Sequence, residues 1–220
     1  MNKINQSYDG ARKDLISFSG CDFSNSVVVD FGCYRGANAR YLKKKYGKVM
    51  YVGFEGNQDA ISEVDDSVDK VIHADLDNFS ADDLRFLDRI DVVILGDVLE
   101  HLKEPDAFML ELSSVINGDT VVIVSVPNIQ YYETFFLLLF GRFPRRERGI
   151  FDKTHLRWFT RKEFLNTICG SYDVIKFQRK YRLVEKPSRI NKLLPLFYPL
   201  VLLLAPYFTF QMHFALKRRG

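Results

Sequence analysis

Short apolar runs alternate with amphipathic segments along most of the chain. Three consecutive valines, Val27–Val29, followed soon by glycines, are typical of a strand buried on both faces. Residues 37–46 and the stretch with Phe108, Leu110 and Leu112 have the pattern of helices with one apolar face. This alternation predicts a parallel sheet covered by helices. The predicted strands are residues 27–30, 49–54, 71–74, 91–95, 120–126, 172–181 and 208–216.

The first predicted strand runs into a turn that contains two glycines, Asp30-Phe31-Gly32-Cys33-Tyr34-Arg35-Gly36. Gly32 and Gly36 would let the backbone turn tightly and approach a ligand. A helix that begins at Ala37 would aim its free N–H groups over the turn. A full GxGxxG motif and a phosphate-binding P-loop are both absent from this stretch. The turn alone therefore fits a nucleoside cofactor, a phosphate or no ligand.

Acidic residues follow the next predicted strands. Glu55 ends the second strand, about twenty residues after the glycine turn, where α/β nucleoside-binding folds place an acid against the ribose. Asp75 and Leu76 follow the third strand, and Asp97 follows the fourth within Gly96-Asp97-Val98-Leu99-Glu100-His101-Leu102. These positions all fall at the same edge of a parallel sheet.

Taken together and in this order, these pieces resemble the class I S-adenosylmethionine-dependent methyltransferases over roughly residues 25–180. The resemblance implies an α/β fold with a doubly wound, mostly parallel seven-stranded sheet, whose last strand lies antiparallel between the fifth and sixth. It implies S-adenosylmethionine as cofactor, with Tyr8 and Arg12 of the N-terminal arm as additional contacts. The usual middle glycine of the turn is Tyr34, which leaves the shape of the turn open. The residues expected to bind the cofactor are Asp30, Gly32, Cys33, Gly36, Glu55, Asp75, Leu76 and Asp97.

Length and composition indicate one methyltransferase domain over residues 1–220. The three cysteines form neither a CxxC motif nor an even framework, which favours a reducing compartment and argues against a structural zinc site. The first twenty residues contain no apolar stretch typical of a secretory signal, so we expect a cytoplasmic protein. Residues 142–220 contain 18 Lys and Arg against 5 Asp and Glu. This basic half suggests an acidic partner, a membrane surface or a solvated face.

Residues 127–160 are predicted to be an insertion on the acceptor side, with an apolar helix over 131–140 and an arginine-rich loop over 141–149. Thr160 and Glu163 have the spacing of a capping box for a helix over 161–169. The pattern FDxTHLRWFT resembles methyltransferases of sugar and cell-surface polysaccharide pathways. It implies O-methylation of a sugar, a glycan or a lipid-linked small molecule. His155 is the first candidate base and His101 the second. Expected acceptor-binding residues are Asn128, Arg145, Arg146, Arg157 and Trp158.

A second arrangement stays open. Asp97, Glu100 and His101 lie within about one helical turn, and His155 follows 155 − 101 = 54 residues later. This resembles the metal-binding residues of the small-RNA 2′-O-methyltransferases, and such ligands suit magnesium or manganese. An RNA 2′-O-methyltransferase is therefore the alternative to a metal-free enzyme. Nucleic acid is the less expected partner, because no added RNA module is visible. A cofactor-binding scaffold without activity is a third possibility.

Residues 189–207 form a second, hydrophobic insertion, placed before the last strand. Leu193 to Phe210, 18 positions, contains no charged residue, which is the lower limit for a membrane-spanning helix. Pro195, Pro199 and Pro206 interrupt it. We expect a helical hairpin that lies in the membrane interface at the inner face, or that covers an acyl-bearing substrate. A buried lid or a dimer contact is the alternative.

Overall fold

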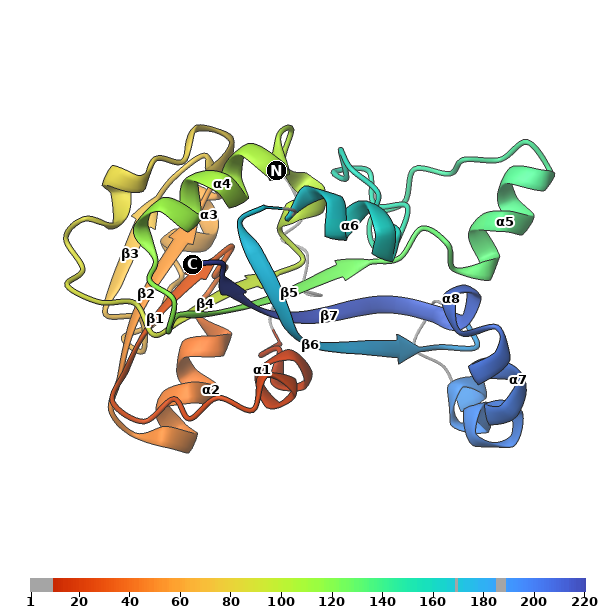
Figure 1. Ribbon diagram of the computed structural model, residues 1–220, viewed down its shortest axis with the longest axis horizontal. Helices are drawn as coiled ribbons and strands as arrows, with labels where there is room; N and C mark the ends of the chain where they lie inside the picture. Colours follow the sequence, from red (N-terminus) through yellow and green to blue (C-terminus); the bar gives the residue numbers. More distant parts are fainter. Residues whose placement is uncertain (1–9, 169, 185–188) are drawn as a thin grey trace.

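The computed structural model describes residues 10–168, 170–184 and 189–220. Within these ranges, seven strands form one sheet in the order β3-β2-β1-β4-β5-β7-β6 (Figure 1). β7 is antiparallel to both of its neighbours, and the β1–β5 pairings are parallel. The predicted α/β methyltransferase-type sheet, including the place of its last strand, is confirmed. The strands are β1 Ser26–Phe31, β2 Val49–Glu55, β3 Lys70–His73, β4 Val92–Gly96, β5 Val121–Pro127, β6 Tyr172–Tyr181 and β7 Thr209–Arg218.

Helices cover both faces of the sheet, with α1 and α2 on one side and α4 and α6 on the other (Figure 1). The α-helices are α1 Lys13–Ser19, α2 Ala37–Tyr46, α3 Gln58–Ile61, α4 Pro105–Val115, α5 Tyr132–Leu139, α6 Arg161–Thr167, α7 Tyr198–Leu203 and α8 Ala205–Phe208. The 3-10 helices are Leu76–Asn78, Ala81–Leu84, Leu99–His101 and Arg189–Phe197.

Successive residues of β1 enter different cores. Val28 packs in the core that contains α1 and α2, whereas Val29 and Phe31 pack in the core that contains α4 and α6. Both faces of this strand are buried, as the valine run predicted. The sheet is therefore held at its centre by two apolar layers, which fixes the positions of its strand ends.

Two details of the helices differ from the predictions. Leu110 was expected in the apolar face of α4 but is 63% exposed, because the buried positions 105, 108, 109 and 112 define a stripe that excludes it. α6 begins as predicted after the Thr160 cap, whose Oγ1 accepts the Glu163 N–H at 3.1 Å. α6 ends at Thr167, and Cys169 lies outside the described residues.

The segments after β5 and before β7 gather at one end of the sheet (Figure 1). There the Tyr132 ring of α5 lies 5.6 Å from the Phe208 ring of α8, and its hydroxyl donates to the Leu183 carbonyl. Asn128 connects the same two segments, since its Nδ2 donates to the carbonyls of Pro206 and Thr209 at 2.7 and 2.8 Å. Across the described part of the chain, we find no helix with the length and apolar content needed to cross a membrane.

Candidate active site

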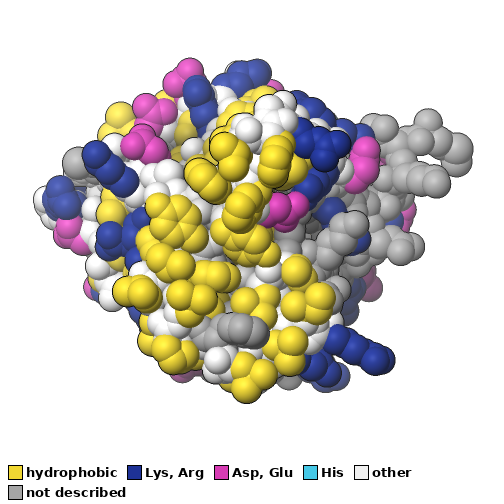
Figure 2. All heavy atoms as spheres, turned by 90° about the vertical axis from the view of Figure 1, so that its right-hand side faces the viewer, with side chains coloured by type: hydrophobic (Ala, Val, Ile, Leu, Met, Phe, Trp, Pro, Cys, Tyr) yellow, Lys and Arg dark blue, Asp and Glu magenta, His cyan; other side chains and the backbone are white. Residues whose placement is uncertain are grey.

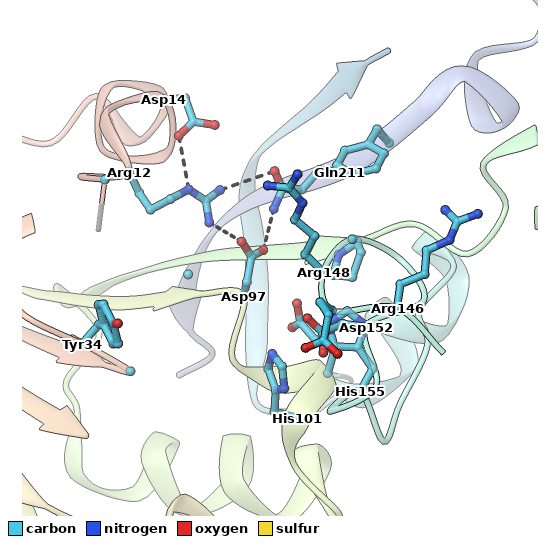
Figure 3. Close-up of a pocket in the computed structure, with 18 of the residues that line it drawn as sticks. Arg12, Asp14, Tyr34, Asp97, His101, Arg146, Arg148, Asp152, His155 and Gln211 are labelled. Carbon is cyan, nitrogen blue, oxygen red and sulfur yellow. Dashed lines mark hydrogen bonds and ion pairs between the residues drawn. The ribbon is translucent and has the colours of Figure 1, made fainter. Parts of the chain in front are cut away.

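A cavity of about 1400 Å³ lies where β1, β4 and β5 end and β7 begins (Figure 3). Its walls come from the glycine turn after β1, the segment before α1, the end of β4, the first turn of α5, the loop 145–149 and Gln211 of β7. Ligands bind at this edge in open α/β sheets. The cavity therefore coincides with the edge at which the sequence placed its acidic and histidine residues.

The glycine turn needs its glycines for two different reasons. Gly32 has φ +75° and lines the cavity, and a Cβ there would lie 3.2 Å from Val98 Cγ2. Gly36 has φ +79°, and a Cβ would lie 2.6 Å from Val68 Cγ2. Gly36 thus permits packing against Val68 and is outside the cavity lining in the described structure. Tyr34, which replaces the usual middle glycine, also has positive φ, +49°.

Glu55 closes the turn from the end of β2. One of its carboxylate oxygens accepts the Tyr34 N–H and the other accepts the Asn57 N–H, both at 2.8 Å. Glu55 lies outside the lining formed by the described residues. Its carboxylate is therefore fixed beside the turn, and both oxygens keep lone pairs for a further donor.

Asp30 forms a buried wall of the cavity and fixes the start of α2. Asn38 Nδ2 donates to its carboxylate at 3.0 Å, and the Tyr51 hydroxyl donates to the same oxygen. Burial raises the pKa of Asp30 to about 6, although these two hydrogen bonds oppose the shift. Asn38 Oδ1 in turn accepts the Arg12 N–H at 2.8 Å, which attaches the segment before α1 to α2.

Asp97 is the centre of a hydrogen-bonded group at the end of β4 (Figure 3). Arg12 Nη1 lies 2.5 Å from one of its oxygens, while Ser125 Oγ and Gln211 Nε2 donate to the other at 2.9 and 2.5 Å. Asp97 has φ +60°, a backbone conformation that non-glycine residues seldom adopt. The contacts come from three separate parts of the chain, the segment before α1, β5 and β7, so the strained residue is held by tertiary structure.

His155 and His101 meet on the opposite wall. Their ring centroids are 4.8 Å apart with an edge-to-face angle of 76°. The contact arises because the Glu100 carbonyl accepts the N–H groups of Leu156 and Arg157 at 2.8 and 3.0 Å. These bonds dock the loop before α6 onto the 3-10 helix Leu99–His101.

The proton of His155 can be placed from its partner. Its Nδ1 lies 3.1 Å from the Ile150 carbonyl, which can only accept, so the neutral ring is protonated at Nδ1. Its Nε2 then has a lone pair. Burial, followed by the nearby His101, lowers the pKa of His155. Burial also lowers the pKa of His101. His155 is therefore a neutral proton acceptor near pH 7.

Glu100 is almost completely buried beside these rings, at 1% exposure. Its Oε2 has no hydrogen-bond partner among the described residues, and burial followed by the nearby Asp97 raises its pKa well above the usual value. Donor atoms of Glu100, His101 and His155 lie within 4.8 Å of one another, a set that could hold a divalent ion. Asp97 was part of the metal-binding alternative, but Arg12, Ser125 and Gln211 engage its carboxylate outside this group.

Three arginines of the loop 145–149 line the cavity: Arg145, Arg146 and Arg148. Arg145 Nη2 donates to the Lys153 carbonyl at 2.6 Å, and Arg146 Nη2 pairs with Glu133 of α5 at 2.8 Å. The structure thus brings the two predicted arginines, Arg145 and Arg146, to the cavity and adds Arg148. Glu133 and Glu147 line the same wall, so the three arginines leave it with a small net positive charge.

Three other predicted acceptor contacts are not at the cavity. Asn128 is buried and uses its amide to hold the α8 end of the chain. Arg157 points to the Lys103 carbonyl, to which its Nε donates at 2.8 Å. Trp158 Nε1 donates to the Ile150 carbonyl at 3.2 Å and packs on Phe143. These side chains support the loops around the cavity and lie outside its lining among the described residues.

Some of the predicted cofactor residues line the cavity, and others lie outside its lining. Asp30, Gly32, Cys33 and Asp97 line the cavity. Asp75 and Leu76 lie at the carboxyl end of β3, outside this lining, and Asp75 caps a 3-10 helix by accepting the Asp77 N–H at 3.1 Å. The Cys33 thiol is buried against Gly53, where a Cβ would lie 2.4 Å from its sulfur, and burial raises its pKa. Tyr8 lies outside the described residues.

Gln211 is the main residue that sequence reasoning missed. It is a polar residue in an apolar strand, and its role depends on the β5–β7 register, which places it opposite Pro127. Asp152 is also part of the cavity wall, where its Oδ1 accepts the Thr154 N–H at 2.9 Å. Asp152 belongs to the FDxTHLRWFT pattern, which was the available signal.

Comparison with known families adds to this geometry. Residues 5–168 match the model of a family described as a methyltransferase domain. The chain belongs to that family. The predicted enzyme class, a methyltransferase that uses S-adenosylmethionine, is confirmed at this level.

Individual relatives of this methyltransferase are distant. An (S)-tetrahydroprotoberberine N-methyltransferase from Eschscholzia californica is 29% identical over 105 residues, which span 44% of this chain and 29% of that protein. A SAM-dependent methyltransferase from Archaeoglobus fulgidus superposes with TM-score 0.58 at 20% identity, covering 94% and 90% of the two chains. A magnesium protoporphyrin IX methyltransferase from Synechocystis PCC 6803, solved with bound SAH, gives TM-score 0.61 at 14% identity, covering 97% and 83%. The two structures show the shared fold.

The residues of this methyltransferase fit S-adenosylmethionine. A cofactor that combines a sulfonium cation with a nucleoside needs an open turn and nearby carboxylates, and the wall near Gly32 supplies both through Asp30 and Asp97. The Glu55 carboxylate, with lone pairs to spare beside the same turn, suits the ribose hydroxyls. The carboxylates Asp30 and Asp97 and the arginines of the loop 145–149 face the cavity from different elements.

Proposed function

We propose that this methyltransferase transfers a methyl group to a hydroxyl of a sugar, a glycan or a lipid-linked small molecule, with His155 as the general base. The observation that supports this most is the buried His155 ring, fixed through Nδ1 by Ile150 and left with an unprotonated Nε2. A hydroxyl must lose its proton as it is methylated, whereas the activated methyl group is supplied by the cofactor. The methyl–sulfur bond breaks as the methyl–oxygen bond forms, and Nε2 takes the proton.

The arginine wall suggests an acceptor that is anionic near its reacting group. Arg145 and Arg146 are held in place by Lys153 and Glu133, and such fixed guanidinium groups suit phosphate or carboxylate. We therefore infer that a phosphosugar or an acidic sugar is oriented by this wall while His155 faces the hydroxyl. We also propose that the methyltransferase works at the cytoplasmic side of a membrane.

The test is transfer of a labelled methyl group to fractionated acceptors. The protein is incubated with methyl-labelled S-adenosylmethionine and with glycolipid, soluble sugar phosphate, amine or RNA fractions. We expect base-stable label in a sugar-bearing fraction. Label confined to amines would instead extend the likeness to the N-methyltransferase relative and would contradict the hydroxyl acceptor.

One observation favours a second candidate, a metal-dependent 2′-O-methyltransferase of RNA. The donor atoms of Glu100, His101 and His155 are close enough together for one ion, and Glu100 Oε2 has no hydrogen-bond partner among the described residues. In this case activity on an RNA 3′ end would be lost in EDTA and restored by magnesium or manganese. Glu100→Gln would abolish the metal response. Activity on a sugar acceptor that is insensitive to EDTA would rule this candidate out.

A further inference from the structure

The exposed apolar side chains of this protein are concentrated in two segments. Of the twenty large hydrophobic side chains exposed among the described residues, six lie in 135–143 and nine in 190–207. Phe140 is 74% exposed, and Leu203 is 79% exposed. We call the exposed apolar side chains of these two segments the apolar platform. Its size exceeds what scattered surface residues explain.

The two segments are distant in the sequence but adjacent in space. Tyr132 joins them, since its ring contacts Phe208 and its hydroxyl donates to the Leu183 carbonyl. Asn128 adds a second connection through Pro206 and Thr209. Figure 2 views this end of the molecule directly and shows hydrophobic side chains over most of it, with Lys and Arg side chains and some Asp and Glu around them.

The net charge around the apolar platform is positive. Residues 132–149 and 189–208 contain six Lys and Arg against two Asp and Glu, a net charge of 6 − 2 = +4. Both acids are paired with cations, Glu133 with Arg146 and Glu147 with Lys153. Arg189 and Lys192 are exposed beside the apolar residues of their own segment. Apolar side chains surrounded by basic ones match a bilayer with anionic headgroups.

The platform is also continuous with the cavity. Tyr132 and Glu133, in the first turn of α5, line the cavity, and the later turns of the same helix carry Phe135, Phe136 and Leu139 of the platform. The arginine wall continues from this helix through the loop 145–149. An acceptor whose tail remained in the bilayer could therefore present its anionic headgroup to the cavity.

We propose that the apolar platform is a docking surface for an anionic membrane, and that the cavity receives a lipid-linked acceptor from that surface. The choice of a lipid-linked acceptor rests on the proposed function, whereas membrane docking does not. The short helices of residues 189–208 lie along the surface, with Leu200, Leu202 and Leu203 in the hydrocarbon boundary. Arg189, Lys192 and the loop arginines contact the headgroups.

The experiment is flotation of the full chain with phosphatidylcholine vesicles, with and without phosphatidylglycerol, at low and high salt. Phe136→Ser with Leu203→Ser removes one platform side chain from each segment. The matched control is Phe86→Ser with Leu110→Ser, which removes the same residue types, 44% and 63% exposed, away from the platform. Emission from Trp158, the one tryptophan, and thermal unfolding verify that each variant is folded.

We expect the wild type and the control to float with anionic vesicles, and less well at high salt. The platform variant should bind the vesicles at least about tenfold more weakly, because two apolar side chains are lost from the hydrocarbon boundary. If the double variant does not fold, Leu203→Ser alone is compared with Leu110→Ser alone.

Absence of flotation by the wild type, or equal flotation by both variants, would overturn the proposal. So would a wild-type dimer that ignores vesicles and becomes monomeric in the platform variant, since the platform would then join two copies. Cofactor binding is measured in parallel by calorimetry and should be equal in all variants. A protein that floats but methylates no sugar would contradict the proposed function and leave membrane docking in place.

Discussion

The two walls of the cavity are built on different physical principles. The wall near β1 and β4 is made of carboxylates that already have partners, such as Asp30 with Asn38 and Asp97 with Arg12. The wall near α5 consists of loop arginines held at a few points and continues into exposed apolar side chains. A preorganised wall suits a constant cofactor, whereas a basic wall open to the surface suits an acceptor that varies. Variants of the two walls should therefore affect cofactor affinity and acceptor use separately.

The largest effect on activity is expected from His155, the proposed general base on the acceptor side of the cavity. His155→Ala should lower kcat by about 100- to 10,000-fold, the usual contribution of a positioned base, and leave cofactor affinity unchanged. Steady-state kinetics and calorimetry measure the two quantities. The control is His73→Ala, an exposed histidine on β3. Activity within a few-fold of wild type would show that His155 has a structural role and that the base is another group.

The rigidity of the cofactor side can be tested through two glycines with the same backbone conformation. Gly36 (φ +79°, ψ 22°) and Gly20 (φ +73°, ψ 8°) are both left-handed, but a Cβ at Gly36 would lie 2.6 Å from Val68 Cγ2, whereas a Cβ at Gly20 would meet only Lys176 Nζ, at 3.7 Å. Both alanine variants incur strain of about 1–2 kcal/mol. Gly36→Ala should lose roughly a further 1–3 kcal/mol of unfolding free energy through overpacking. Urea unfolding measures the difference. Equal losses of unfolding free energy in the two variants would show that the glycine turn can shift to accommodate a methyl group.

Asp97 offers a smaller test of the same wall. Asp97→Asn keeps the shape but weakens the bonds from Arg12, Ser125 and Gln211, so unfolding free energy should fall by roughly 1.5–3 kcal/mol. Cofactor affinity should fall as well, because the cavity wall loses its order. The matched control is Asp173→Asn, which breaks the exposed pair with Arg219 and should change stability by less than about 1 kcal/mol. Similar losses in both variants would mean that the Asp97 group is not preorganised.

The smallest effect is the pH dependence of the acceptor side. Burial, followed by His101, lowers the pKa of His155 below its usual value, and only the unprotonated ring accepts a proton. Activity should therefore be full above this pKa and fall by about tenfold per pH unit below it. A kcat/KM profile between pH 4.5 and 8 measures this, with His101→Gln as the control for the neighbouring charge. A profile without an acidic limb would contradict the assignment of His155 as base.

The contrast between the walls also explains what the sequence could predict. Gly32, Glu55 and Asp97 follow apolar strands directly, so their arrival at one edge follows from the parallel pattern alone. Asn128 follows β5 in the same way, but its side chain turns to the carbonyls of Pro206 and Thr209. That partner lies 78 or 81 residues away, beyond the reach of any local signal.

On the acceptor side, too, the direction of the side chains could not be predicted from the local sequence. Arg157 and Trp158 were assigned to acceptor binding because their types suit a site, yet both are used to build the loop that supports His155. Arg12 and Gln211 meet across 199 residues, and their pairing depends on the register of β7. Residue type and order therefore brought Asp30, Gly32, Cys33 and Asp97 to the cavity, whereas side-chain direction on the acceptor side required the tertiary contacts.

The position of β7 has a consequence for the order of folding. β7 comes after the other described strands in the chain, yet it lies between β5 and β6 and brings Gln211 to Asp97. Until β7 docks, β5 and β6 each have an unpaired edge, which is prone to association with other chains. Such long-range pairing is also slow to form. The rate at which cofactor affinity appears during refolding should therefore report the insertion of β7, later than the collapse of β1 to β4.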